Sequence, residues 1–121
     1  MLADVTANVG DLEQAKRFYA QALTPLGYSL RMEFEGGAGF GAGEGMADFW
    51  LGSSSERGAT HVAFAARDRA AVDAFYDAAM ATGGKDNGLP GLRPHYHENF
   101  YAAHVHDPDG NNIEAVTHRP E

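Results

Sequence analysis

The sequence predicts an α+β fold made of two copies of one unit, each running strand, helix and then three strands. Residues 4–23 align with residues 61–80 at an offset of 57, with five identities in twenty positions. The identities fall on matching elements: a short apolar strand, an aspartate that could cap a helix, and a Phe-Tyr pair on that helix's buried face. We therefore expect one domain over residues 1–121, with module 1 at about 1–57 and module 2 at about 58–121. The identical pairs are Val5 and Val62, Asp11 and Asp68, Phe18 and Phe75, Tyr19 and Tyr76, and Ala22 and Ala79.

The first unit opens with a predicted strand at Leu2 to Val9 and continues into an amphipathic helix. Asp11, followed three residues later by Gln14, resembles a capping box at the start of the helix. Apolar residues then recur at helical spacing from residue 12 to residue 23. Pro25 and Gly27 end the helix, because proline cannot continue it.

Three strands should complete the first unit, at residues 28–34, 39–42 and 48–51. Six glycines between Gly36 and Gly45 invite comparison with phosphate-binding loops. No helix follows them, and there is no Gly-Lys-Ser or Gly-Lys-Thr, so that comparison fails. Glycines in strand-like surroundings instead indicate bends, bulges or a close approach to the backbone.

The second unit repeats this order, with a strand at 60–66 and a helix whose apolar stripe runs from Val72 to Met80. We expect residues 83–98 to be a long loop, and loops of that length are usually functional or disordered. Residues 100–106 and 112–117 should form a hairpin around the turn Asp107-Pro108-Asp109-Gly110.

Composition fits one compact domain and excludes several classes of partner. The chain is 44% hydrophobic and has no cysteine, so any metal site must use histidine nitrogen and carboxylate oxygen. Seventeen acidic against nine basic residues give a net charge of −8, which disfavours nucleic acid as a partner. There is neither an 18-residue apolar run nor a basic, apolar leader. We therefore expect a cytoplasmic protein without a membrane partner.

Several segments together resemble the vicinal oxygen chelate superfamily. The segments are His61 in "HVAF", "GLRPHYH", and "YAAHVHDPDGNNIEAV" with its Glu114. This superfamily includes glyoxalase I, bleomycin-resistance proteins, fosfomycin-resistance proteins and extradiol dioxygenases. The resemblance implies that the two βαβββ modules form a curved, half-open, eight-stranded barrel, usually in a homodimer. It also implies a site built from both modules, sometimes across two chains.

The resemblance implies a divalent metal held from the first, fifth and eighth strands, often by His, His and Glu. Here His61 and Glu114 match that pattern, while Asp4 stands where the family usually has a histidine. A carboxylate can replace an imidazole around Fe²⁺, Mn²⁺, Zn²⁺ or Mg²⁺. Two neighbouring substrate oxygens could then chelate the ion. The alternatives are a surface carboxylate at Asp4 and a hydrogen-bonded polar pair at His61 and Glu114 without an ion.

Further candidate residues include Tyr96, His97 and Tyr101, which lie on or next to the predicted loop. Glu114, His97 and Tyr101 are the candidate catalytic residues, and His97 could move a proton near neutral pH. Two His-x-His pairs, at 95 and 97 and at 104 and 106, are either a second metal site or, as we favour, exposed imidazoles. The candidate substrate-binding residues are Trp50, Tyr96, Arg93 and Phe40.

Two functions stay open at this point, with a third that is weaker. The first is a metal-dependent enzyme acting on a small substrate with vicinal oxygens, by isomerase, lyase or dioxygenase chemistry. The second is a metal-free protein of the bleomycin-resistance type, which sequesters an aromatic or cationic compound. The third is an interaction module without a small-molecule site, since fold does not dictate activity.

Overall fold

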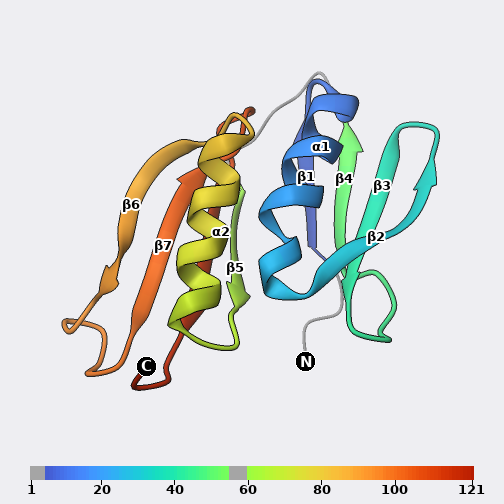
Figure 1. Cartoon of the computed structure of the whole chain (residues 1–121). Coiled ribbons are helices and arrows are strands. Elements are labelled where there is room, and N and C mark those ends of the chain that lie inside the picture. The colour runs from blue at the N-terminus through green and yellow to red at the C-terminus, as the bar shows by residue number, and fades with distance from the viewer. Residues whose placement is uncertain (1–4, 55–59) are drawn as a thin grey trace.

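The computed structural model describes residues 5–54 and 60–121 and shows two βαβββ modules (Figure 1). Module 1 contains β1 (Val5–Val9), α1 (Leu12–Ala22), the short 3₁₀ helix η1 (Thr24–Leu26), β2 (Tyr28–Phe34), β3 (Gly37–Ala42) and β4 (Phe49–Ser53). Module 2 contains β5 (His61–Ala65), α2 (Arg69–Ala81), β6 (Lys85–Leu92), β7 (Tyr101–His106) and β8 (Asn112–Thr117). The predicted alternation of elements is confirmed, and the ends of the predicted helices and strands differ from the observed ones by at most three residues where the structure describes them.

Each module forms one four-stranded sheet, and the two sheets have the same topology. Their strand orders are β1-β4-β3-β2 and β5-β8-β7-β6. In both, the first and last strands of the module pair in parallel, and the other pairs are antiparallel. The two sheets are not closed onto one another, so the expected half-open arrangement is confirmed.

Both helices begin at an aspartate that caps the first turn, as predicted. The Asp11 carboxylate accepts a hydrogen bond from the backbone N–H of Gln14 at 3.0 Å. The Asp68 carboxylate accepts one from the backbone N–H of Ala71 at 2.9 Å. Each cap satisfies an N–H that has no partner within the helix. In the described part of the chain, no helix is long and apolar enough to cross a membrane.

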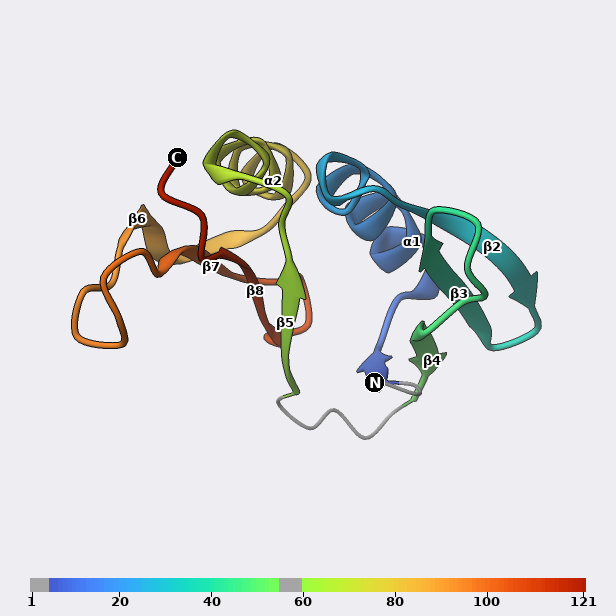
Figure 2. The ribbon, with the colours of Figure 1, turned by 90° about the horizontal axis from the view of Figure 1, so that it is seen from below.

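The core lies between the helices and the sheets. Each helix packs on one face of its own sheet, and the two helices lie side by side (Figure 2). Aromatic rings link the modules, because Phe49 of β4 meets Tyr19 of α1 and Phe64 of β5 with ring centroids 5.0 and 5.2 Å away. We call the sheet face that no helix covers the open face.

A buried carboxylate in the turn after β7 also ties the modules together. Asp107 is 2% exposed and accepts the Tyr19 hydroxyl of α1 at 2.5 Å. It also accepts the side-chain amide of Asn111 at 2.9 Å, and that amide donates to the Asn8 carbonyl of β1 at 3.2 Å. Burial, and then the charge of Asp107, raise the pKa of Tyr19 well above its usual value.

The prediction of a long loop over residues 83–98 is wrong, because β6 occupies Lys85–Leu92. β6 is an edge strand, and its register with β7 shifts on both sides of Gly88. Pro90 lacks a backbone N–H, which an edge strand tolerates. The bulged pairing removes the two-residue alternation that identifies a strand from sequence.

The glycines of β3 lie where other side chains cross the strand closely. A Cβ on Gly39 would stand 2.6 Å from the Trp50 ring, and one on Gly37 would stand 2.5 Å from the Phe34 ring. The expectation of close backbone approach is therefore confirmed here. These glycines let both aromatic rings lie against the open face of the module 1 sheet.

Candidate metal centre

Strand register places His104 and Glu114 side by side on the open face of module 2. Val105 and Ile113 belong to the core on the helix side. Because successive side chains of a strand point to opposite faces, His104 and Glu114 point to the open face. The two residues are direct partners in the β7–β8 ladder.

His61 reaches the same point from β5. Its neighbour Val62 is 6% exposed and belongs to the core, so His61 projects to the open face. In the parallel ladder, Ala63 lies opposite Glu114, so His61 sits two residues earlier and reaches Glu114 diagonally. Three neighbouring strands thus each contribute one polar side chain.

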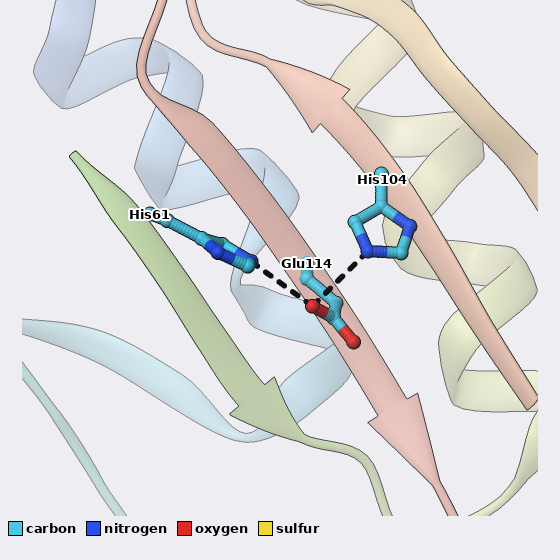
Figure 3. A group of neighbouring side chains, drawn as sticks. All are labelled: His61, His104 and Glu114. Carbon is cyan, nitrogen blue, oxygen red and sulfur yellow. Dashed lines mark hydrogen bonds and ion pairs between the residues drawn. The ribbon is translucent and has the colours of Figure 1, made fainter. Parts of the chain in front are cut away.

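The two imidazoles converge on a single carboxylate oxygen of Glu114 (Figure 3). Nε2 of His61 and Nε2 of His104 each lie 3.1 Å from Oε1 of Glu114. The side chain of Glu114 is 8% exposed, that of His104 is 19% exposed and that of His61 is 58% exposed. The centre is therefore anchored in the sheet at Glu114 and opens to solvent at His61.

The donor set fits a divalent ion. One ligand atom from each residue lies within 4.8 Å of the others, and no second group of this kind occurs in residues 5–54 and 60–121. An ion with bonds of about 2.0–2.2 Å holds adjacent donors roughly 3–3.5 Å apart. The 3.1 Å from each Nε2 to Oε1 of Glu114 matches that spacing. Two histidines and one carboxylate form the set that holds iron in non-haem oxygenases and zinc in many hydrolases.

The same geometry also forms a hydrogen-bonded group. In the absence of an ion, each imidazole can donate its Nε2 hydrogen to the Glu114 carboxylate. An ion would need the lone pair at each of these nitrogens instead. The same three side chains can thus serve either as metal ligands or as a hydrogen-bonded group.

Of the predicted ligands, the structure brings His61 and Glu114 together, and Asp4 lies outside the described residues. Sequence reasoning missed His104 as their partner. The signal was in the hairpin, since a turn at 107–110 puts residue 104 opposite residue 114. The His-x-His pairs do not form pairs of ligands; His104 joins His61 instead, and His97 contacts His118.

Tyr101 lies away from this centre. It is the neighbour of Ala102 on β7 and faces the helix side, where its hydroxyl donates to Asp73 of α2 at 2.7 Å. The guanidinium carbon of Arg69 lies 5.1 Å from the centre of the Tyr101 ring. Partial burial, and then the bond to Asp73, raise the pKa of Tyr101. The geometry therefore does not bring this hydroxyl to the open face.

His97 and Tyr96 lie on the segment between β6 and β7. The His97 Nε2 is 2.5 Å from Nδ1 of His118, and the two rings stack with centroids 4.6 Å apart. Tyr96 is 64% exposed and packs against Phe100 with ring centroids 4.9 Å apart. These residues form an aromatic cluster of their own, apart from the three ligands.

The remaining predicted contacts divide between the two faces of the sheets. Trp50 is half-buried on the open face of module 1, where it lies against Gly39 and Phe34. Phe40 is fully buried in the core of module 1. Arg93 is half-buried and lies beside Gly88 of β6, on the same face as His104.

The two modules differ at equivalent positions. Val5 pairs with Phe49 as Val62 pairs with Ile113, so Trp50 is the counterpart of Glu114. Trp50 pairs with Gly39 as Glu114 pairs with His104. In the described residues, module 1 therefore presents an aromatic ring where module 2 presents metal-binding groups.

Comparisons with known proteins agree with this architecture. The sequence profile of the glyoxalase/bleomycin resistance protein/dioxygenase superfamily matches residues 2–115. A crystal structure of a glyoxalase/bleomycin resistance protein from Albidiferax ferrireducens T118 is similar at 29% identity and a TM-score of 0.84, covering 95% of this chain and 97% of that chain. No curated protein matches the chain.

Two further structures share the fold at lower identity. A glyoxalase/bleomycin resistance protein/dioxygenase family enzyme from Burkholderia phytofirmans PsJN is 20% identical with a TM-score of 0.76, covering 98% of each chain. A lactoylglutathione lyase from Agrobacterium tumefaciens is 21% identical with a TM-score of 0.70, covering 97% of this chain and 92% of that chain. The profile match and the paired βαβββ modules lead to one conclusion: the chain belongs to the glyoxalase/bleomycin resistance protein/dioxygenase superfamily.

Proposed function

We propose that the protein is a metal-dependent enzyme acting on a small substrate with two neighbouring oxygens, and that His61, His104 and Glu114 hold the ion. The observation that supports this most is the convergence of three donors, within 4.8 Å, from three adjacent strands. Asp4, expected from the sequence as the first-strand ligand, lies outside the described residues and stays a predicted ligand. Two imidazoles favour Fe²⁺, Zn²⁺ or Mn²⁺ over Mg²⁺, which prefers oxygen ligands throughout.

The chain's own groups would fix the position and exposure of the reacting centre. A buried Glu114, held between two histidines, defines the ligand geometry from the sheet side. The exposed side of His61 leaves room for substrate to approach from solvent. A bound divalent ion would supply Lewis-acid polarisation of the two substrate oxygens. Dependence of turnover on O₂ separates dioxygenase chemistry from isomerase or lyase chemistry.

Metal titration tests the proposal directly. Isothermal titration calorimetry of chelator-treated protein with Fe²⁺ under nitrogen, Mn²⁺, Zn²⁺ and Mg²⁺ should show one site per chain for at least one ion. Replacing a ligand should weaken that site at least about 10-fold, since even groups that only orient ligands have effects of that size. We therefore expect H104A and E114Q to lose affinity.

His106→Ala is the matched control, because His106 lies two residues from His104 on the same strand. Its loss should leave metal affinity unchanged. Wild-type protein that binds none of the four ions stoichiometrically, or H104A that binds like wild type, would contradict the proposal.

A metal-free binding function is the second candidate. Nε2 of His61 and Nε2 of His104 each lie 3.1 Å from the Glu114 carboxylate, a polar group that can stand by itself, and Met32, Phe34 and Trp50 present apolar surface on module 1. An aromatic cation such as ethidium would then change Trp50 fluorescence equally with and without EDTA. A change that requires metal would favour the enzyme.

We also propose that the protein is a homodimer that binds a small molecule and acts in the cytoplasm. Support for the dimer comes from superfamily membership and from apolar side chains left exposed on β2, where Met32 and Phe34 are 51% and 52% exposed. Association would remove this surface from water. The absence of nucleic-acid and membrane partners stays a prediction from composition.

A further inference from the structure

Arg93 holds a fixed position on the open face of module 2. Its Nη1 donates to the Gly91 carbonyl at 3.0 Å, and its Nη2 donates to the Leu89 carbonyl at 2.9 Å. The side chain thus folds back along β6 and is half-buried. Two anchored nitrogens leave little rotational freedom to a side chain that is ordinarily flexible.

Glycines make room for this guanidinium beside the candidate metal centre. A Cβ on Gly88 would lie 3.2 Å from Nη2 of Arg93 and 3.4 Å from Nδ1 of His104. A Cβ on Gly91 would lie 3.3 Å from Nη1 of Arg93. Because Gly88 is the ladder partner of His104, the cation and the imidazole flank the same bare stretch of backbone.

The charge of Arg93 has no acidic partner in residues 5–54 and 60–121. Its hydrogen-bond acceptors are carbonyls, and no carboxylate there lies within ion-pair distance. A guanidinium carries five N–H donors, so three remain for another group. A preorganised cation of this kind suits the planar, two-oxygen geometry of a carboxylate.

We propose that Arg93 forms a subsite for a carboxylate of the substrate, an inference that rests on the proposed metal-dependent function. His104 presents Nε2 to the ion site and Nδ1 toward the Gly88 gap beside Arg93. The subsite therefore lies on the Nδ1 side of the His104 ring, and the ion site lies on its Nε2 side. The substrate class is then a small acid in which a ring or short chain separates the carboxylate from the vicinal oxygens.

Paired probes test this assignment. Calorimetry on Zn²⁺-loaded protein would compare catechol with 3,4-dihydroxybenzoate, which adds only a carboxylate across the ring. A charged hydrogen-bonded pair predicts that wild type binds the acid at least about 10-fold tighter than catechol. Arg93→Gln should bring this ratio close to one and leave catechol affinity unchanged. Arg93→Lys should keep part of the preference, because lysine retains the charge but not the fork.

Arg17→Gln is the control, because it removes one positive charge at an exposed position of α1. It should keep the wild-type ratio. A wild-type ratio near one, or an unchanged ratio in Arg93→Gln, would overturn the subsite. Loss of catechol affinity in Arg93→Gln would also overturn the subsite, because it would show that Arg93 stabilises the strand and does not bind the carboxylate.

A metal-free arm separates this proposal from the proposed function. Benzoate binding measured in EDTA should be present in wild type and lost in Arg93→Gln. The separating outcome is that benzoate binds wild type but not Arg93→Gln in EDTA, while catechol binds equally well with and without zinc. That result would support the carboxylate subsite and reject the metal-dependent function.

Discussion

Gly39 and Trp50 show how one residue sets the character of a whole sheet face. The indole ring lies over Gly39 because that position lacks a side chain. At the equivalent place in module 2, His104 has a side chain, and its Nε2 lies 3.1 Å from the Glu114 carboxylate. The same register thus produces an aromatic surface in one module and a polar centre in the other.

Gly39→Ala should therefore disturb module 1. The new methyl group would stand 2.6 Å from the Trp50 ring and 3.0 Å from Cβ of Ala47, so the indole must move. Overpacking of this kind costs about 1–3 kcal/mol. Urea denaturation should show the loss, and the emission of Trp50 should shift toward that of an exposed indole.

Gly52→Ala is the matched control on the neighbouring strand. Its Cβ would lie 3.6 Å from Thr6 and 3.7 Å from Asn8, which is ordinary contact. Stability should hold or rise slightly, because alanine restricts the unfolded chain. Equal losses of stability in Gly39→Ala and Gly52→Ala would show that the close approach of Trp50 to Gly39 does not cause the destabilisation.

Single residues of the site were predictable to different degrees. His61 and Glu114 could be assigned because their surrounding segments resemble a known superfamily. The role of His104 was missed because it depends on which residue faces it across the hairpin, a pairing that the predicted turn at 107–110 implies but that resemblance alone does not show. Arg93 was recognised as a loop cation, but its orientation depends on the carbonyls of a bulged strand.

The helices illustrate how local rules fix an element from its first residue. Asp11 and Asp68 both satisfy a backbone N–H in the first turn. The apolar stripe that follows needs only the period of the helix, so both elements could be predicted from sequence. Residues such as Phe18 and Phe75, predicted on those stripes, are fully buried.

Asp68→Ala should weaken α2. Loss of the N-cap costs about 0.5–2 kcal/mol, because the Ala71 N–H loses its acceptor. Chemical denaturation followed by circular dichroism would measure this. Asp77→Ala in the same helix, at an exposed interior position, should leave stability unchanged or improve it, since alanine is the better helix former. A larger loss in Asp77→Ala than in Asp68→Ala would contradict the capping role.

The strands were less uniform in how well they could be predicted. The β7–β8 hairpin followed from its turn sequence, because proline and glycine at 108 and 110 suit a tight turn. β6 did not, since its glycines and proline read as loop residues. β6 is a strand only because it pairs with β7, and the sequence of β6 alone does not reveal that pairing.

At the scale of the whole molecule, the contact between Tyr19 and Asp107 joins the two modules through buried groups. The raised pKa of Tyr19 in the folded state gives this contact a pH dependence. A folded-state pKa above the unfolded value contributes stability below the unfolded pKa, and the contribution is lost as pH rises further. For tyrosine the unfolded value is about 10.

Tyr19→Phe should therefore be less stable than wild type at pH 8, by about 1–3 kcal/mol. The difference should shrink above about pH 10, where ionisation of Tyr19 favours the unfolded wild-type chain. Burial and Asp48 raise the pKa of Tyr28 to about 12. Tyr28 is present in both proteins, so its contribution cancels in the difference between them. Urea denaturation from pH 8 to pH 11 measures the difference. A difference that stays constant over this range would contradict the argument.

Exposed apolar surface on β2 makes the oligomeric state testable. Phe34→Glu would place a charge in the proposed interface, so light scattering should report a fall from twice the 12.9 kDa chain mass to a single chain. Met46, at 90% exposure in the segment between β3 and β4, provides the control, and Met46→Glu should stay dimeric. Wild-type protein that already runs as a single chain would contradict the dimer.

His61 and Glu114 stand 53 residues apart in the chain, and α2, β6 and β7 all lie between them. An ion bound to both residues would connect the two ends of nearly all of module 2. It would stabilise the folded state of that module, because a ligand that binds only the folded state stabilises it by mass action. Metal starvation would then affect more than catalysis. It would leave this half of the protein open to proteolysis and so couple the protein's lifetime to metal supply.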